Sequence, residues 1–286
     1  MVLPVAFDHE IYRLANPDLV ELSPGALEAH YEVHGRAEGR ICSEVDTKLA
    51  FKRLLLDLEN LLEIGPFNSP VALHPSTEYA DLYSQDGLRR RAAEIGIPES
   101  GCPEIKWVLG EEGLSLINKR YSGVVSSHMI EHSPDLIEHL QQVANLLHPD
   151  GRYYLVVPDY RFCFDHYLPE TTVADVLEAH IEKRVSHSMG SVIEHLRLTT
   201  HNDPVRHWNG DHGDDPRRKS VEISSFLGDD YSHTKADVHS WHFTPESFAT
   251  LIGVLRSAEL IQFEIERSYP TVRNNLEFFA VLKKSG

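Results

Sequence analysis

An apolar run at residues 61–65 ends in the first candidate ligand-binding turn. The run is closed by Gly65, and Pro66 and Phe67 follow it. Glycine permits a tight turn and lets the backbone approach a ligand closely. Phe67 and Ser69 stand where loops that bind dinucleotides or nucleoside triphosphates need glycine or lysine to accommodate phosphates. The turn therefore predicts a ligand without phosphate groups.

Candidate catalytic residues follow another apolar run, residues 152–157. Asp159, Asp165 and His166 lie within ten residues of its end. A histidine beside a carboxylate can take the proton of a hydroxyl that attacks an electrophile. We expect His166 to be this general base, with Asp165 and Asp159 as the other catalytic candidates. The alternative is that Asp165 caps the next segment and His166 only packs.

The segment His128-Met-Ile-Glu131-His132 has the HxxEH spacing of an inverted zinc-protease motif. That motif requires both histidines one turn apart on a helix. Ser133 and Pro134 are typical of an N-cap and a first helical position, so we expect the next helix to begin there. Residues 128–132 would then lie in a loop, which makes a zinc hydrolase the lesser hypothesis.

Half of the eighteen histidines lie between His180 and His242. A single long helix over residues 171–198 would place His180, His187 and His195 on one face. These three lack the i, i+4 spacing of a helical metal site. A second group has a composition that can bind a divalent metal ion, although an ordinary polar loop has the same composition: His201, His207, His212, Asp237, His239 and His242.

The order of predicted elements indicates the fold. Five short strands alternate with helices, which is typical of an α/β protein with a doubly wound, mostly parallel Rossmann-like sheet. Two further strands near the end of the chain, over residues 261–268 and 277–283, predict an antiparallel hairpin at the sheet edge. The five parallel strands are expected at residues 61–65, 77–83, 105–109, 121–127 and 152–157.

The chain divides into two expected parts. Residues 1–44 read as a small helical unit, since turn signals separate short helical segments there. Residues 45–286 form the α/β domain. Within it, residues 170–242 interrupt the alternation of strands and helices. They are expected to be a largely helical insertion that lies on the side of the site where the second substrate, the acceptor, binds.

Three segments resemble class I S-adenosylmethionine-dependent methyltransferases. LLEIGPFNSP resembles the first motif of that family, TEYADLYSQDGLRRRA its second strand, and VVSSHMIEHSPDLIEHLQQVANLLHPDGRYYLVVPD its fourth strand, helix and fifth strand. The likeness extends over about residues 50–165, and it departs from the family's glycine-rich loop at Phe67 and Ser69. It implies a methyltransferase with S-adenosylmethionine as cofactor and S-adenosylhomocysteine as product.

The resemblance also implies which residues bind the cofactor. Asp81 corresponds to the acid that accepts hydrogen bonds from the ribose hydroxyls. Glu63 is expected to orient the methionine amino group through backbone or water. The full set of expected cofactor-binding residues is Glu63, Gly65, Pro66, Phe67, Asp81, Glu111, Glu112, Ser127 and His128.

The first 45 residues carry a second resemblance. The pattern FDxxxYxxxNPD followed by HYxxHGxxEGR is similar to a motif that accompanies glycosyltransferases and other polysaccharide-related enzymes. It implies a small-molecule or saccharide acceptor, methylated on a hydroxyl, and polysaccharide-synthesis enzymes as partners. A non-catalytic adenosylmethionine-binding scaffold in such an assembly is the alternative.

Composition excludes several other classes of protein. The net charge of −17 argues against a nucleic-acid-binding surface. No window approaches 18 continuous apolar residues, so no membrane span is expected. The three cysteines have no CxxC spacing, which fits a reducing compartment and no thiolate metal site. A cytoplasmic location is the expectation.

Overall fold

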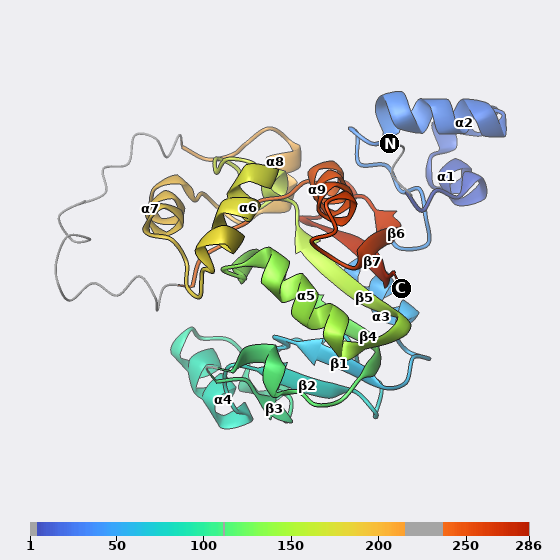
Figure 1. Ribbon diagram of the computed structural model, residues 1–286. Helices are drawn as coiled ribbons and strands as arrows, with labels where there is room; N and C mark the ends of the chain where they lie inside the picture. Colours follow the sequence, from blue (N-terminus) through green and yellow to red (C-terminus); the bar gives the residue numbers. More distant parts are fainter. Residues whose placement is uncertain (1–4, 111, 215–236, 286) are drawn as a thin grey trace.

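A seven-stranded sheet forms the centre of the protein. The computed structural model describes residues 5–110, 112–214 and 237–285. The strand order is β3-β2-β1-β4-β5-β7-β6, with β7 antiparallel to both of its neighbours and the other pairs parallel. This confirms the doubly wound, mostly parallel sheet and the terminal antiparallel hairpin (Figure 1). The strands are β1 Leu61–Ile64, β2 Glu78–Asp81, β3 Trp107–Val108, β4 Tyr121–Ser127, β5 Leu147–Pro158, β6 Phe263–Tyr269 and β7 Glu277–Lys284.

Nine α-helices occur in the described part of the chain. They are α1 His9–Ala15, α2 Pro24–His30, α3 Lys48–Leu54, α4 Gln85–Glu94, α5 Leu136–Leu146, α6 Val173–Glu182, α7 Met189–Leu198, α8 Pro204–Trp208 and α9 Pro245–Ser257.

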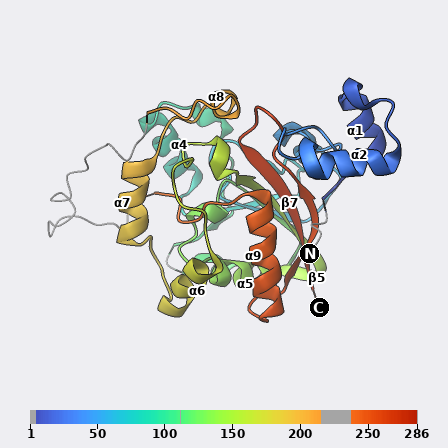
Figure 2. The same cartoon turned by 90° about the horizontal axis from the view of Figure 1, so that it is seen from above.

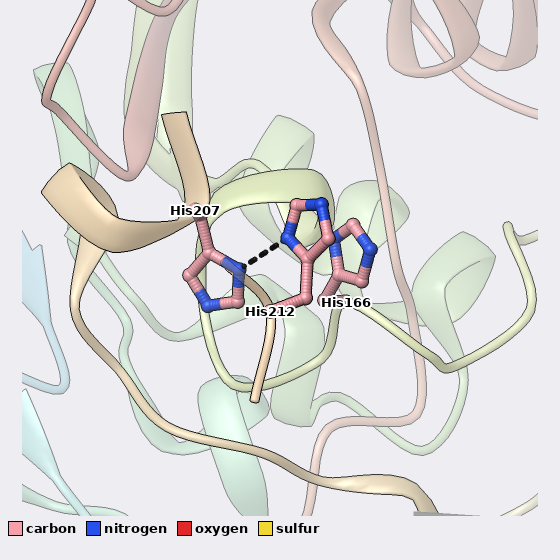
Figure 3. A group of neighbouring side chains, drawn as sticks. All are labelled: His166, His207 and His212. Carbon is pink, nitrogen blue, oxygen red and sulfur yellow. Dashed lines mark hydrogen bonds between the residues drawn. The ribbon is translucent and has the colours of Figure 1, made fainter. Parts of the chain in front are cut away.

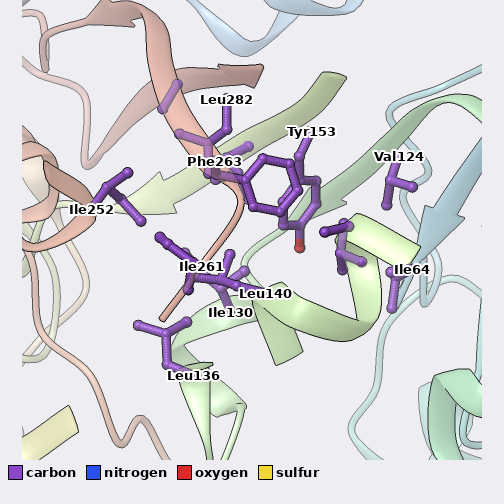
Figure 4. Close-up of a cluster of buried hydrophobic side chains, with 14 of the residues drawn as sticks. Ile64, Val124, Ile130, Leu136, Leu140, Tyr153, Ile252, Ile261, Phe263 and Leu282 are labelled. Atoms are coloured by element: carbon purple, nitrogen blue, oxygen red, sulfur yellow. The ribbon is translucent and has the colours of Figure 1, made fainter. Parts of the chain in front are cut away.

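Alternating side chains of the strands pack against helices on the two faces of the sheet. Leu61 and Val125 join a cluster with Phe51 of α3 on one face. Leu62 and Val124 point to the opposite face, where the larger cluster gathers residues of α5, α6 and α9. Figure 4 shows Val124 in this cluster with Leu140 of α5 and Ile252 of α9. The period of two along each strand therefore fills both cores. The same burial fixes the register that brings the carboxyl ends of β1, β2 and β4 together.

Helix α5 begins two residues later than the sequence predicts. Its N-cap is Asp135, whose carboxylate accepts from the Glu138 amide at 2.9 Å. Ser133 instead directs its hydroxyl to the carbonyl of Asp135 at 3.1 Å. Aspartate and serine are comparable N-caps, so the prediction of Ser133 was wrong because a second, equally good cap lies just downstream.

The single long helix expected over residues 171–198 is wrong. The chain forms two helices, α6 and α7, and Lys183 after α6 adopts a left-handed conformation with φ of 53°. Ser188 then caps α7 by accepting from the Ser191 amide at 3.0 Å. The break means that His180, His187 and His195 do not share one helix face.

The N-terminal helices α1 and α2 lie on the opposite side of the molecule from helices α6 and α7 of the insertion (Figures 1 and 2). The N-terminal unit has its own small core, formed by Tyr12, Leu19, Leu27, Tyr31 and Cys42. It is tied to the exposed edge of the sheet by a hydrogen bond from the Ala6 amide to the Ser268 carbonyl of β6, at 2.9 Å. No helix among the described residues is long and apolar enough to cross a bilayer.

Candidate functional site

The turn after β1 lies where the carboxyl ends of three parallel strands meet. Gly65 has φ of +68°, and its amide donates to the Ala80 carbonyl of β2 at 2.9 Å. A Cβ added at Gly65 would lie 3.0 Å from Cγ of Met129, which follows β4. Glycine is therefore required here for both the left-handed backbone and the close approach of the segment after β4.

Pro66 and Phe67 continue this turn. Phe67 also adopts a positive φ of 43°, although it is not glycine. Its ring packs against the cluster formed by Leu88, Ala92 and Cys102. Phe67 therefore combines ring packing with a left-handed backbone conformation, which a glycine adopts more readily.

Asp81 closes β2 directly beside this turn. Its Oδ1 accepts from the Tyr83 amide at 3.2 Å. Burial raises the pKa of the Asp81 carboxyl, while the amides of Tyr83, Leu82 and Phe67 act in the opposite direction. The carboxylate is therefore close to the amide of Phe67 in this turn, and Asp81 as a residue is half-buried.

Glu63 lies beneath the turn and not on its surface. The side chain is 1% exposed, and its carboxylate accepts from the amides of Val71 and Ala72, at 2.8 Å from each. Burial raises its pKa to about 7, while these backbone hydrogen bonds lower it. Glu63 thus holds the loop after β1 in place, and its carboxylate is already occupied.

The other expected cofactor residues are distributed around the same edge. Ser127 ends β4, and His128 follows it with φ of +50°. The His128 Nε2 pairs with Oε2 of Glu277 at 2.6 Å. Glu112 is exposed beyond β3, while Glu111 lies outside the described residues.

The three catalytic candidates occupy different environments. Asp159 is fully buried and accepts from Nη2 of Arg161 at 2.6 Å and from the Thr271 hydroxyl at 2.7 Å, so its carboxylate is fully engaged. Asp165 is also buried, and its hydrogen-bonded histidine is His239, with Nδ1 at 2.5 Å from Oδ2. The structure therefore does not pair Asp165 with His166.

His166 belongs to a cluster with His207 and His212 (Figure 3). Its ring stacks on that of His212 with centroids 3.6 Å apart. Its Nδ1 lies 2.8 Å from the Arg161 carbonyl, which can only accept, so Nδ1 carries the proton and Nε2 is the basic nitrogen. Burial lowers the pKa of His207 to about 4, which keeps that neighbour neutral.

The HxxEH segment does not form the zinc-hydrolase arrangement. Only residues Ile130–His132 make a short 3₁₀ turn, and His128 precedes it. The two histidines therefore do not stand one turn apart on a helix. This agrees with the expected loop and argues against the zinc-hydrolase hypothesis.

The pairing of His239 with Asp165 could not be predicted from the sequence. The two residues are 74 positions apart, so their spacing did not indicate the pair. The one signal in the sequence was the composition of Asp237, His239 and His242, which can bind a divalent metal ion.

The histidines of the insertion helices lie apart from one another. His180 pairs with Asp135 at 2.9 Å, and His187 pairs with the Ser240 hydroxyl at 2.7 Å.

Comparison with known proteins identifies the family. The family described as "Methyltransferase domain" matches residues 34–202, which is more than half of the chain. A search of curated proteins finds no match.

Solved methyltransferase structures are also similar to the chain. One is an S-adenosylmethionine-dependent methyltransferase from Clostridium acetobutylicum, with 11% identity, a TM-score of 0.42, and coverage of 92% of this chain and 99% of that one. A putative S-adenosylmethionine-dependent methyltransferase from Listeria monocytogenes has 14% identity, a TM-score of 0.39, and coverage of 84% and 98%. The mitomycin 7-O-methyltransferase MmcR has 14% identity and a TM-score of 0.40, and the match covers 96% of this chain but only 62% of MmcR. On the family match, the chain belongs to the methyltransferase-domain family.

Proposed function

We propose that this protein methylates a hydroxyl group of a saccharide or glycan intermediate. The observation that carries the proposal is the position of His166 after β5, with its tautomer fixed by the Arg161 carbonyl. A sugar hydroxyl is a poor nucleophile at neutral pH and needs a base. The resemblance of the N-terminal unit to a motif of polysaccharide-related enzymes supports the choice of a saccharide.

The turn after β1 and the end of β2 fit the cofactor. Gly65 leaves room for close approach of backbone, and the partly exposed Asp81 provides a carboxylate for two hydroxyls. Glu63 holds the loop between them through Val71 and Ala72. S-adenosylmethionine, when bound, supplies an electrophilic methyl group.

His166 is the residue that we assign to proton removal. No hydrogen bond among the described residues involves its Nε2, so this nitrogen can accept the proton of the acceptor hydroxyl. Asp159 is unsuited to the task because Arg161 and Thr271 already occupy its oxygens. Asp165 is also unsuited, because its carboxylate is hydrogen-bonded to His239.

Calorimetry and a transfer assay test the proposal together. The purified chain should bind S-adenosylmethionine and S-adenosylhomocysteine, but not NAD or ATP, because the turn lacks the glycines and lysine that hold phosphates. Radiolabelled S-adenosylmethionine should then label one class within a panel of saccharides and saccharide-lipid intermediates. Labelling of proteins or aromatic amines alone would contradict the saccharide assignment. Tight cofactor binding without transfer to any acceptor would favour the scaffold alternative.

The His166→Ala variant tests the base. Turnover should fall by about 10²–10⁴, the scale of lost general-base catalysis, while cofactor affinity stays the same. His201→Ala, which changes a histidine of the neighbouring loop, is the matched control. A His166→Ala enzyme with normal turnover would exclude His166 as the base.

A further inference from the structure

In the segment after β4, the buried carboxylate of Glu131 has no hydrogen-bonding partner among the described residues. Glu131 is 0% exposed, and neither oxygen of its side chain accepts a hydrogen bond from any described residue. An isolated carboxylate is costly to bury, so buried carboxylates are normally paired or bind a metal ion. Glu131 lies two residues after Met129, the side chain that approaches Gly65.

Two histidines bring nitrogen atoms to this carboxylate. One atom each from Glu131, His132 and His239 lie within 4.8 Å of one another. The distance from His239 Nε2 to Glu131 Oε1 is 3.9 Å, and the rings of His132 and His239 meet edge to face with centroids 4.6 Å apart. His128 Nδ1 also lies 3.8 Å from the same oxygen of Glu131. Both nitrogen–oxygen distances, 3.9 Å from His239 and 3.8 Å from His128, are too long for hydrogen bonds.

Asp165 determines which nitrogen of His239 faces Glu131. The Nδ1 of His239 donates to Asp165 Oδ2 at 2.5 Å, which leaves the lone pair of Nε2 on the side of Glu131. Histidines that bind metals commonly donate their other ring N–H to a carboxylate in this way.

Backbone contacts fix the two segments against each other. The Ser240 amide donates to the Glu131 carbonyl at 2.7 Å, and the indole of Trp241 donates to the Ser133 carbonyl at 2.6 Å. The arrangement is therefore held by the fold before any ligand binds.

We propose that Glu131, His132 and His239 bind a divalent transition-metal ion, with Asp165 as the residue that positions His239. Two imidazoles and one carboxylate form a donor set that zinc and related ions accept while keeping a coordination position open. Magnesium favours an all-oxygen set and is the poorer fit. Bonds of about 2 Å to one ion place tetrahedral ligand atoms about 3.3 Å apart. The 3.9 Å between His239 Nε2 and Glu131 Oε1 would therefore shorten by about 0.6 Å when the ion binds.

The open position would bind the oxygen of the acceptor hydroxyl and make it easier to deprotonate. This last role rests on the proposed function, whereas the binding of the ion does not.

The cluster of His166, His207 and His212 is the rival site. There His207 is hydrogen-bonded through both ring nitrogens without an ion: its Nδ1 faces His212 Nδ1 at 3.0 Å, and its Nε2 faces the His201 carbonyl at 3.0 Å. In the described ranges, no carboxylate joins that cluster. The unpartnered Glu131 therefore favours the first site.

Zinc chloride is the probe that tests the inference. The full chain, stripped with a chelator and dialysed, should bind one zinc ion per chain in calorimetry, and metal analysis should recover the same ratio. Glu131→Gln keeps the size of the side chain and should weaken binding by more than about 100-fold, because loss of an outer partner alone costs about 10- to 100-fold. Asp165→Asn should show that smaller, outer-partner effect.

His207→Ala is the matched control and should leave zinc affinity unchanged. His239→Gln provides a second ligand variant if Glu131→Gln does not fold, and circular dichroism checks the fold of each. The inference is overturned if the wild type binds no zinc. It is equally overturned if His207→Ala abolishes binding while both ligand variants retain it.

The outcomes also separate this inference from the proposed function. Methyl transfer to a saccharide by a protein that binds no zinc would reject the metal site and leave the function standing. Stoichiometric zinc binding through Glu131, without saccharide methylation, would do the reverse.

Discussion

At the scale of single residues, Asp81 is the side chain on which cofactor affinity should depend most directly. Replacing it by alanine removes the carboxylate that we propose accepts the ribose hydroxyls. Affinity for S-adenosylmethionine should weaken by about 1.5–3 kcal/mol, the usual range for hydrogen bonds to a charged group. Calorimetry measures the change. Asp86→Ala, on the exposed first turn of α4, is the control, and equal affinities of the two variants would remove Asp81 from the site.

Glu63 should make stability depend on pH. Its pKa is raised from 4.5 to about 7 because the carboxyl is buried, although the amides of Val71 and Ala72 lower it. The folded state therefore holds this proton more tightly than the unfolded state. The contribution to stability is fully present below about pH 4.5 and is lost as pH rises through about 7, with a magnitude of about 3 kcal/mol at most.

Urea unfolding of the wild type and of Glu63→Gln between pH 5 and pH 8 checks this prediction. Glutamine cannot ionise, so the variant should lack this part of the pH dependence. The stability of the wild type relative to the variant should fall as pH rises. A constant difference over the range would show that Glu63 has the same pKa in both states.

At the scale of elements, the N-cap of α5 places the segment that follows β4. Asp135 caps the helix and also pairs with His180 of α6 at 2.9 Å. Asp135→Ala should lower the free energy of unfolding by about 2 kcal/mol, the upper end for loss of an N-cap. Ser133→Ala should cost about 0.5 kcal/mol or less, since Ser133 makes no cap. Denaturant titration compares them, and a larger loss for Ser133→Ala would restore Ser133 as the cap.

The two insertion helices show how elements divide the histidines. The left-handed Lys183 ends α6 and redirects the chain into α7. As a result His180 faces α5, whereas His187 faces the segment before α9 through Ser240. A continuous helix would have placed both on one surface, so a single residue conformation changes which side chains can meet.

At the scale of the whole molecule, the N-terminal unit lies at the β6 edge, away from the ends of β1, β2 and β4 (Figure 1). Removing residues 1–44 should therefore leave affinity for S-adenosylmethionine unchanged. It should also promote self-association, because the β6 edge loses its hydrogen bond from Ala6 and its cover. Calorimetry and light scattering measure the two effects. Loss of cofactor affinity in a truncated chain that is still folded would show that the unit helps to build the site.

The sequence by itself determined the fold class and the framework of the site. Apolar runs of five or six residues, such as those ending at Gly65 and Val157, are typical of buried parallel strands and indicate where the strands end, at one edge of the sheet. Gly65 and Asp81 could be placed at that edge because both signals are local: one turn and one strand end. Helix boundaries were less certain where two N-caps compete, as Ser133 and Asp135 do.

Only the tertiary structure decided which polar groups meet. Asp165 was expected beside His166, its neighbour in sequence, but it pairs with His239, 74 residues away. Glu63 looked like a ligand-facing acid, yet it binds the amides of Val71 and Ala72. The physical reason is that strand and helix signals arise from interactions within a few residues. The partner of a buried charge depends instead on packing between segments that the sequence separates, and burial makes that pairing obligatory.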